Sequence, residues 1–461
     1  MDSTRSNIAH LYRRAGFGAR PDEIDRAVAA GYAATVESLL AGLKAADQAG
    51  DAIAVPSFTP RSTRSAATGQ AATAPADPAA KMAANRARQA LERQELQALQ
   101  QWWLNRMIVT STPLREKLTL IWHGHFATGF AKVKDAGFMY RQNQLLRALG
   151  GASFEALTQA VAKDPAMMFW LDTQLNVAGH PNENFARELM ELFTLGIGNY
   201  GEADVQQAAR AFTGWAFVPG TGAFVLRPQR HDGGSKSFLG QSGSFDGTDI
   251  VRIVTHQPAS ARFVVAKLWS HLAYPISTSD PITADLAAAY AKDLDITGLV
   301  RRILLHPGFT SATARQGLIK QPIEWAVGAA RSLGLNASLQ PRTPPAQPVA
   351  AAAQPLLLSA VLSRLAQEPL NPPSVGGWPQ NGYWLNTASS LARLQIGLAI
   401  GQRLDLAWLD SIAVGQRTDA LAAHLSIDGW GQTTAAALNH VASQPAVLVG
   451  LALSAPEYVL N

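Results

Sequence analysis

The chain has 461 residues, of which 47% are hydrophobic and 16% are charged, and its formal net charge is +5. This length and composition predict one large folded body over residues 1–461, with an extensive core, rather than several domains. Because the chain contains no cysteine, disulfides, thiolate catalysis and cysteine-based metal sites are excluded. The positive charge is spread along the chain without a nucleic-acid motif, so we expect no nucleic-acid partner. An anionic polysaccharide, or another negatively charged cell-envelope polymer, fits this charge better.

The sequence contains neither a membrane span nor a recognisable leader. No apolar run approaches the roughly 20 residues that a membrane-spanning helix needs. The opening residues, MDSTRSNIAHLYRRAGFG, lack the apolar core of a signal peptide. Taken alone, they predict a soluble protein that is not exported. A chain whose leader had been removed would look the same, and the absence of cysteine favours export.

Helical periodicity runs through most of the chain and predicts an all-α fold. The first helix is expected over residues 21–43, where Pro21 suits the first helical position and Gly31 interrupts or ends the helix. Further helices are expected at residues 81–110, 113–126, 140–149, 154–163, 258–272, 280–292, 296–305, 323–333, 356–365, 386–404 and 433–443.

Three segments depart from this helical pattern. Residues 45–80 and 336–354 are rich in alanine, proline and small polar residues, a composition that predicts flexible insertions. Residues 222–243, GAFVLRPQRHDGGSKSFLGQSG, alternate in short runs among glycines. That pattern predicts a small β-hairpin or an irregular functional loop.

The densest polar chemistry lies in residues 182–215, NENFARELMELFTLGIGNYGEADVQQAARAFTGW. Asn182 suits the N-cap of a first helix, which Gly196 stops. Because Met190 and Leu195 fall outside the main apolar face, this helix is apolar around most of its circumference, and we expect it to be buried. A second amphipathic helix follows and is expected to fold back on the first as a helical hairpin.

The charges of this first helix need partners if the helix is buried. Glu183, Arg187 and Glu191 follow i, i+4, i+8 spacing, which allows a ladder of ion pairs. Asn184, Glu188 and Glu191 lie on a second stripe, where Glu188 has no arginine of its own within the helix. Glu188 is therefore the predicted working carboxylate. The alternative is that the whole set is a structural network.

Two histidines two positions apart occur in the motif Trp122-His123-Gly124-His125-Phe126. In a helix they would point in opposed directions, whereas in an extended segment they would share a face, so joint binding of one metal stays open. A single histidine bonded to a carboxylate, acting in proton transfer or satisfied in the core, fits the motif better.

A mixed cluster lies in the glycine-rich motif HDGGSK. His231, Asp232 and Lys236 offer a base, an acid and a cation on a loop, a placement often used at active sites. The alternative is that the glycines form only a turn.

An aromatic loop lies toward the C-terminus. The motif NPPSVGGWP contains Trp378, and the motif YWLN contains Trp384. Aromatic rings on a rigid loop can stack on the flat apolar faces of sugar rings. The alternative is that these rings plug the helical core.

The motifs taken in order resemble the bacterial family DUF1800, whose function is unknown. The resemblance rests on HLYRRAGFGARPDEI, REKLTLIWHGHFATG, residues 182–215, HDGGSKSFLG, ARFVVAKLWSHL, LNPPSVGGWPQNGYWLNTASSLARL and LALSAPEYVLN. Members look like periplasmic or secreted proteins and are often accompanied by a DUF1501 protein related to sulfatase-type hydrolases, so the resemblance implies export and a DUF1501 partner. Relatives commonly have a threonine where this chain has Gly201 before the second helix. Because glycine is tolerated at an N-cap, the position is structural rather than catalytic.

The leading hypothesis is an exported hydrolase or lyase that acts on a cell-envelope or environmental polysaccharide by carboxylate and histidine acid–base chemistry. The candidate catalytic residues are Glu188, His123, His125, Glu191, Asp232 and His231. The candidate substrate-binding residues are Asn182, Asn184, Arg187, Lys236, Trp215, Trp378 and Trp384. The residues do not identify a cofactor.

Two alternatives stay open. A metal-dependent hydrolase would use His123, His125 and carboxylates from the helix that begins at Asn182. A non-catalytic surface-assembly or carbohydrate-binding scaffold would use the polar helix only as a buried structural network. The positions of these side chains in the folded chain distinguish the hypotheses.

Overall fold

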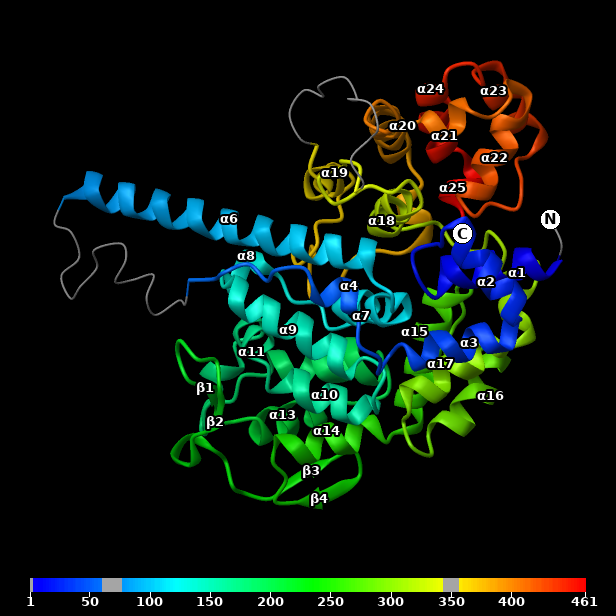
Figure 1. The fold of residues 1–461 in the computed structure, drawn as a ribbon. Helices are drawn as coiled ribbons and strands as arrows, with labels where there is room; N and C mark the ends of the chain where they lie inside the picture. The colour runs from blue at the N-terminus through cyan, green and yellow to red at the C-terminus, as the bar shows by residue number, and fades with distance from the viewer. Residues whose placement is uncertain (1–2, 60–76, 343–355) are drawn as a thin grey trace.

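The computed structural model of the chain describes residues 3–59, 77–342 and 356–461, and it confirms the predicted all-α fold with a small β element (Figure 1). The N-terminal helices are α1 (Ser3–Arg14), α2 (Pro21–Ala30), α3 (Tyr32–Ala41), α4 (Gln48–Asp51) and the long α6 (Pro78–Val109). The next are α7 (Pro113–His125), α8 (Phe130–Val133), α9 (Ala136–Leu149), α10 (Phe154–Ala162), α11 (Pro165–Trp170), η1 (Thr173–Leu175), α12 (Asn184–Glu188), the π-helix η2 (Leu189–Thr194) and α13 (Glu202–Ala211).

The second half of the chain is also helical. Its elements are α14 (Gly247–Thr255), α15 (Pro258–Leu272), α16 (Pro281–Tyr290), α17 (Ile296–Leu305), η4 (Pro307–Thr310), α18 (Pro322–Ser332), α19 (Leu358–Arg364), η5 (Asn381–Trp384), α20 (Thr387–Gly401), α21 (Ala407–Asp410), η6 (Val414–Gln416), α22 (Arg417–His424), α23 (Gln432–His440), α24 (Pro445–Ser454) and α25 (Pro456–Val459). Figure 1 shows α21 to α25 gathered together beside α1 and α2, so the two ends of the chain lie close to each other.

Two antiparallel hairpins follow α13. The first pairs β1 (Trp215–Phe217) with β2 (Phe224–Leu226), the second pairs β3 (Lys236–Phe238) with β4 (Gln241–Gly243), and η3 (Pro228–Arg230) lies between them. The hairpin predicted within residues 222–243 is therefore present, together with a second one whose first strand begins earlier in the chain. Each strand has three residues, so the β element is a small appendage to the helical body (Figure 1).

Several helix boundaries follow from local residue properties. Gly31 has φ 88° and divides the helix expected over residues 21–43 into α2 and α3, because this left-handed conformation strains side chains other than glycine. The sequence pattern does not predict α24, PAVLVGLALS, because its residues are apolar on every side and so lack an amphipathic period.

Two hydrophobic cores meet at α7. Leu118 and Trp122 belong to the core formed with α9 to α17, whereas Leu120 belongs to the core formed with α6 and α18 to α25. Every residue of α7 except Arg115 and Gly124 is buried. A helix buried on all sides must neutralise its charged side chains inside the protein.

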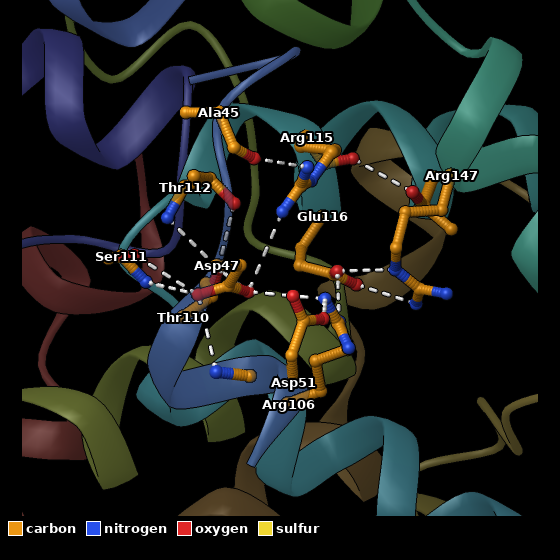
Figure 2. Close-up of polar contacts among 12 residues, drawn as sticks. Ala45, Asp47, Asp51, Arg106, Thr110, Ser111, Thr112, Arg115, Glu116 and Arg147 are labelled. Atoms are coloured by element: carbon orange, nitrogen blue, oxygen red, sulfur yellow. Dashed lines mark hydrogen bonds and ion pairs between the residues drawn. The ribbon is translucent and has the colours of Figure 1, made fainter. Parts of the chain in front are cut away.

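The carboxylate of Glu116, in the first turn of α7, is fully buried and lies between two arginines (Figure 2). It accepts hydrogen bonds from Trp103 Nε1 at 3.1 Å, Arg106 Nε at 2.9 Å, and Arg147 Nε and NH2 at 2.6 and 2.9 Å. Burial alone would raise the pKa of Glu116, but Arg147 and Arg106 outweigh burial and hold its pKa below the ordinary value. The network ties α7 to α6 and α9.

The same network reaches the first residues of the segment expected to be flexible at residues 45–80. Arg106 NH2 lies 3.4 Å from the fully buried Asp47 carboxylate, which also accepts a hydrogen bond from Thr110 Oγ1 at 2.7 Å. A buried acid needs these donors, so they hold Asp47 in place at the described start of this segment. Residues 60–76 lie outside the described residues.

The second expected insertion, at residues 336–354, also begins with packed residues. Ala337 and Leu339 are fully buried, and Ala337 N donates to Asn105 Oδ1 at 2.9 Å. One well-placed leucine docks this stretch on the core, although its average composition is that of a linker. Residues 343–355 lie outside the described residues.

We expect Glu116→Gln to lower the free energy of unfolding by about 3–5 kcal/mol, because the change leaves two buried arginines without their shared carboxylate. Urea denaturation measures this loss. The matched control is Glu37→Gln, in an exposed pair with Arg301 at 2.7 Å, which should cost about 0–1 kcal/mol.

The pH dependence of this stabilisation follows from the lowered pKa of Glu116. The stabilisation is present above the unfolded-state pKa of about 4.3 and is lost as the pH falls through the folded-state pKa. The difference between wild type and Glu116→Gln should therefore shrink in acid. A loss equal to that of the exposed control would contradict the role given to Glu116.

Candidate functional site

The polar helix predicted from residue 182 changes its hydrogen-bonding pattern part of the way along. After α12 ends at Glu188, the chain continues as η2, in which Leu195 N donates to Met190 O at 2.8 Å across five residues. Its apolar side is buried, as predicted, but its polar side is only half-buried. Short π-helical turns occur frequently at functional sites, so the segment stays a candidate.

The ion pairs of this helix agree only in part with the predicted ladder. Arg187 NH2 lies 3.1 Å from Glu183, as the spacing predicts, but both ends of the guanidinium also bind Glu202 of α13, each at 2.8 Å. Glu191 instead accepts a hydrogen bond from Tyr200 OH at 2.9 Å. The prediction of an Arg187–Glu191 pair is wrong, because the wider π-turn rotates Glu191 away and the helical hairpin brings Glu202 to the arginine.

Glu188 is half-buried and has no hydrogen bond or ion pair among the described residues. Burial raises its pKa, Glu191 adds to that rise, and Arg187 opposes it. The N-cap of α12 is Glu183 rather than the expected Asn182, which lies one residue earlier and accepts a hydrogen bond from Asn184 N at 2.9 Å through its Oδ1. Glu188 therefore keeps the properties of a candidate acid, without a partner to activate it.

The two histidines of α7 are both buried and neither bonds to a carboxylate. His123 Nε2 accepts from Leu370 N at 3.1 Å, and His125 Nε2 lies 2.9 Å from Phe193 O. Burial lowers the pKa of His123 to about 3 and also lowers that of His125. Both rings are neutral at pH 7 and connect α7 to neighbouring backbone, although His125 Nδ1 is buried without a partner among the described residues. The expected bond of a histidine to a carboxylate is therefore absent at both positions in the described structure.

The HDGGSK loop satisfies its own charges. Asp232 Oδ2 accepts from Arg210 Nε at 2.7 Å, a contact that lowers the pKa of Asp232 to about 2. Lys236 is buried and donates to Asp232 O at 2.6 Å, while His231 Nδ1 lies 2.9 Å from Thr213 O. These contacts fasten the two hairpins to α13, and they join the loop neither to Glu188 nor to the histidines of α7.

The three candidate tryptophans are buried. Trp215 packs against Phe212 and Phe224 with ring centroids 5.1 and 5.0 Å away, and Trp384 is 1% exposed. Trp378 packs against His123, with the ring centroids 5.3 Å apart. Trp215 and Trp384 thus have no free face for a sugar, whereas Trp378, which is 8% exposed, lines a small pocket beside α7.

A different set of polar side chains converges on a small pocket between α7, α15, α18 and the loop before η5. We call it the Lys267 pocket, and it is lined by Gly124, Lys267, His271, Gln321, Glu324, Gly376, Trp378 and Gln380, with Leu120 and Ile121. Its free volume is about 20 Å³, which is room for a group the size of one water molecule or ion.

The loop that covers this pocket rests directly on the backbone of α7. Gly377 has φ 79°, and a Cβ built on it would lie 2.2 Å from the carbonyl oxygen of Gly124. Only glycine allows this contact, since any side chain there would collide with backbone. The contact holds Gly376 and Trp378 at the pocket.

Lys267 and His271 lie one turn apart on α15 and line the pocket together. Gln380 Nε2 donates to His271 Nε2 at 2.7 Å, while Lys267 has no hydrogen bond or ion pair among the residues that the structure describes. Burial lowers the pKa of Lys267. Burial, with Lys267 and Lys117 nearby, lowers the pKa of His271 to about 3, so its ring is neutral at pH 7.

The one carboxylate that lines the pocket is already engaged. Glu324 forms an ion pair with the buried Lys117 of α7, and its other oxygen accepts from Gln321 N at 3.2 Å at the start of α18. Because Lys117 neutralises Glu324, Lys267 leaves the pocket with an uncompensated positive charge when protonated. The arrangement suits an anionic group beside an amine of reduced basicity.

The sequence alone did not predict the residues that line the Lys267 pocket, although the spacing of two of them is visible in it. The motif ARFVVAKLWSHL carries Lys267 and His271 at i, i+4, so a helix places both on one face. Glu324 and Gln380 lie far away in the chain, and no local pattern links them to α15.

Within the described ranges, no group of three or more His, Asp or Glu side chains is placed to hold a metal ion. Nor is any helix there both long enough and apolar enough to cross a membrane.

Comparison with known proteins links the chain to a family. The model described as "Protein of unknown function (DUF1800)" matches residues 10–460, which is nearly the whole chain. Neither the curated proteins nor the solved structures gave a match.

We expect Glu188→Gln to stabilise the protein by about 0.2–0.5 kcal/mol at pH 7, since it removes a like-charge contact with Glu191. Because the pKa of Glu188 is raised, the wild type loses stability as the pH rises through that pKa, so the difference should vanish below about pH 4. Urea denaturation at both pH values measures it. The control Glu183→Gln, which removes an ion pair of Arg187, should not stabilise. A loss of about 1 kcal/mol or more for Glu188→Gln would reveal a partner of this carboxylate.

Proposed function

The chain belongs to the DUF1800 family, and we propose that it is an exported enzyme that cleaves an anionic polysaccharide of the cell envelope or environment. The proposal keeps the acid–base chemistry expected of a hydrolase or lyase. It moves the reaction from the polar helix to the Lys267 pocket, where the side chains converge on one space.

The observation that carries the proposal is the state of Lys267. Lys267 is half-buried where it lines the pocket, and no acid or acceptor in the described part of the chain pairs with its amine. A lysine inside a protein normally forms an ion pair or reaches solvent. An unpaired amine whose pKa is lowered by burial loses its proton more readily than an ordinary lysine, which favours it as a general base.

The groups around Lys267 favour elimination over hydrolysis. Glycoside hydrolysis uses a pair of carboxylates, whereas Glu324 is the one carboxylate lining this pocket and Lys117 already pairs with it. Elimination from a uronic-acid unit needs only a base and a group that binds the sugar carboxylate. A lyase therefore fits the lining better than a hydrolase does.

The reaction can be written with this chain's residues. Lys267 takes the proton from the carbon next to the sugar carboxylate, the C–H electron pair forms a carbon–carbon double bond, and the glycosidic C–O bond breaks. The leaving oxygen then takes the proton back from Lys267. The neutral ring of His271 and the amide of Gln380 hydrogen bond to one oxygen of the sugar carboxylate. The pocket, which has room for a group the size of one water molecule, takes that oxygen while the polymer lies across its mouth.

A non-catalytic carbohydrate-binding scaffold is the second candidate. The observations that favour it are the closed contacts of the HDGGSK loop and the burial of the three tryptophans, which leave those elements with structural roles. A scaffold would bind the polymer without forming a double bond. The two candidates thus differ in a product that can be measured.

We expect the purified protein to generate ultraviolet absorbance from a new double bond with at least one member of a panel of uronic-acid polysaccharides. Lys267→Met should lower the rate by about 10²–10⁴-fold, the usual contribution of a positioned base. The rate should rise with pH through the pKa of Lys267, which lies below the ordinary value of a lysine. The matched control is Lys132→Met, at a lysine in a partly exposed pair with Asp172, and it should keep the wild-type rate.

Electrophoresis through gels that contain the same polysaccharides separates the two candidates. Retarded migration without any double-bond product over the whole panel would favour the scaffold and refute the lyase. An unchanged rate in Lys267→Met would refute the assignment of Lys267 as the base.

A further inference from the structure

A second pocket lies between α1, the residues after η4, and the C-terminal helices. It has a free volume of about 320 Å³, which lies within the range of small-molecule sites. Its polar lining includes Arg13, Arg315, Asp428, Glu457 and Asn461. Part of the lining comes from the two ends of the chain, which Figure 1 shows side by side, and residues 312–316 complete it.

One carboxylate of this pocket is only half satisfied. Glu457 Oε1 accepts from Gly431 N at 2.8 Å, but Glu457 Oε2 is buried and has no partner. Asn461 Oδ1 is buried without a partner as well. Buried acceptors left without donors are unfavourable, so both atoms suit a ligand that supplies N–H or O–H groups.

One cation of the pocket is also only partly used. Arg13 NH1 donates to Ser426 O, while its Nε and NH2 have no partner among the described residues. The remaining charges cancel, because Arg315 NH1 lies 3.1 Å from Asp428 Oδ2. The pocket thus offers two unbonded guanidinium nitrogens of Arg13, whose charge Asp428 partly balances, and the unbonded Oε2 of Glu457.

We propose that this pocket binds a small zwitterion, a free α-amino acid or a dipeptide, with its carboxylate on Arg13 and its ammonium group on Glu457. The volume accommodates a molecule of this size, and charge-assisted hydrogen bonds to both groups give the affinity. The site is separate from the Lys267 pocket, and none of the residues assigned to the lyase reaction lines it.

The rim of the pocket is held in a defined conformation. Gln316 lines the opening with φ 59°, a left-handed conformation that is uncommon for a residue other than glycine. The adjacent Arg315 donates to Ser6 Oγ and Asn7 Oδ1 of α1. Backbone held in such a conformation recurs at ligand sites, where the surrounding contacts offset its cost.

The proposal can be tested by calorimetric titration of the full chain with glycine and glycylglycine. N-acetylglycylglycine lacks the ammonium group and glycylglycinamide lacks the carboxylate, so each probe removes one of the two interactions. We expect at least one zwitterion to bind. Each half-probe should bind at least about 10-fold more weakly than glycylglycine, because it has lost one charge-assisted contact.

Two variants assign the contacts. Glu457→Gln should abolish the preference for a free ammonium group, and Arg13→Met should abolish the preference for a free carboxylate, while Glu37→Gln should change neither. Thermal melting identifies any variant that fails to fold, and the half-probe comparison on wild type decides the question without the variants. The proposal would be overturned if neither zwitterion binds, or if the half-probes bind as tightly as glycylglycine. Double-bond formation from polysaccharide should be unchanged in both variants, so the two proposals can fail separately.

Discussion

Neutralising the charges of one fully enclosed helix is the constraint on which the rest of the structure depends. Glu116 and Lys117 are neighbours on α7, and successive side chains on an α-helix point about 100° apart. Glu116 therefore reaches α6 and α9, whereas Lys117 reaches Glu324 of α18. These pairs connect the two hydrophobic cores that meet at α7. Because Glu324 also lines the Lys267 pocket, the packing of the body and the electrostatics of the proposed active site share one carboxylate.

Amphipathic periodicity predicts the all-α class and many of the helices, because burial of one face is a local property of the sequence. It does not predict the transition to η2, since the spacing of apolar residues carries no mark of a hydrogen bond across five residues instead of four. The predicted charge ladder shows the same limit. The pair of Arg187 with Glu183 is local and is present, but the pair with Glu202 depends on how two helices fold together.

The candidate site was harder to predict than the fold. Charged residues close together in the sequence, such as Asp232 and Lys236, are natural candidates for a functional site. Their proximity in the chain, however, also lets such residues satisfy each other. The Lys267 pocket draws its lining from four separated segments. Only the spacing of Lys267 and His271 was readable in the sequence, whereas the placement of Gln380 and Glu324 is set by tertiary packing.

The contact of Gly377 with the backbone of α7 determines how much the pocket mouth can move. Where two backbones touch without an intervening side chain, no rotamer change can open or close the gap. The covering loop is therefore pre-organised by α7, a helix that is itself buried along most of its length. A ligand that enters this pocket meets walls that are already in place, so its binding costs little ordering entropy and discriminates ligands by size rather than by adaptation.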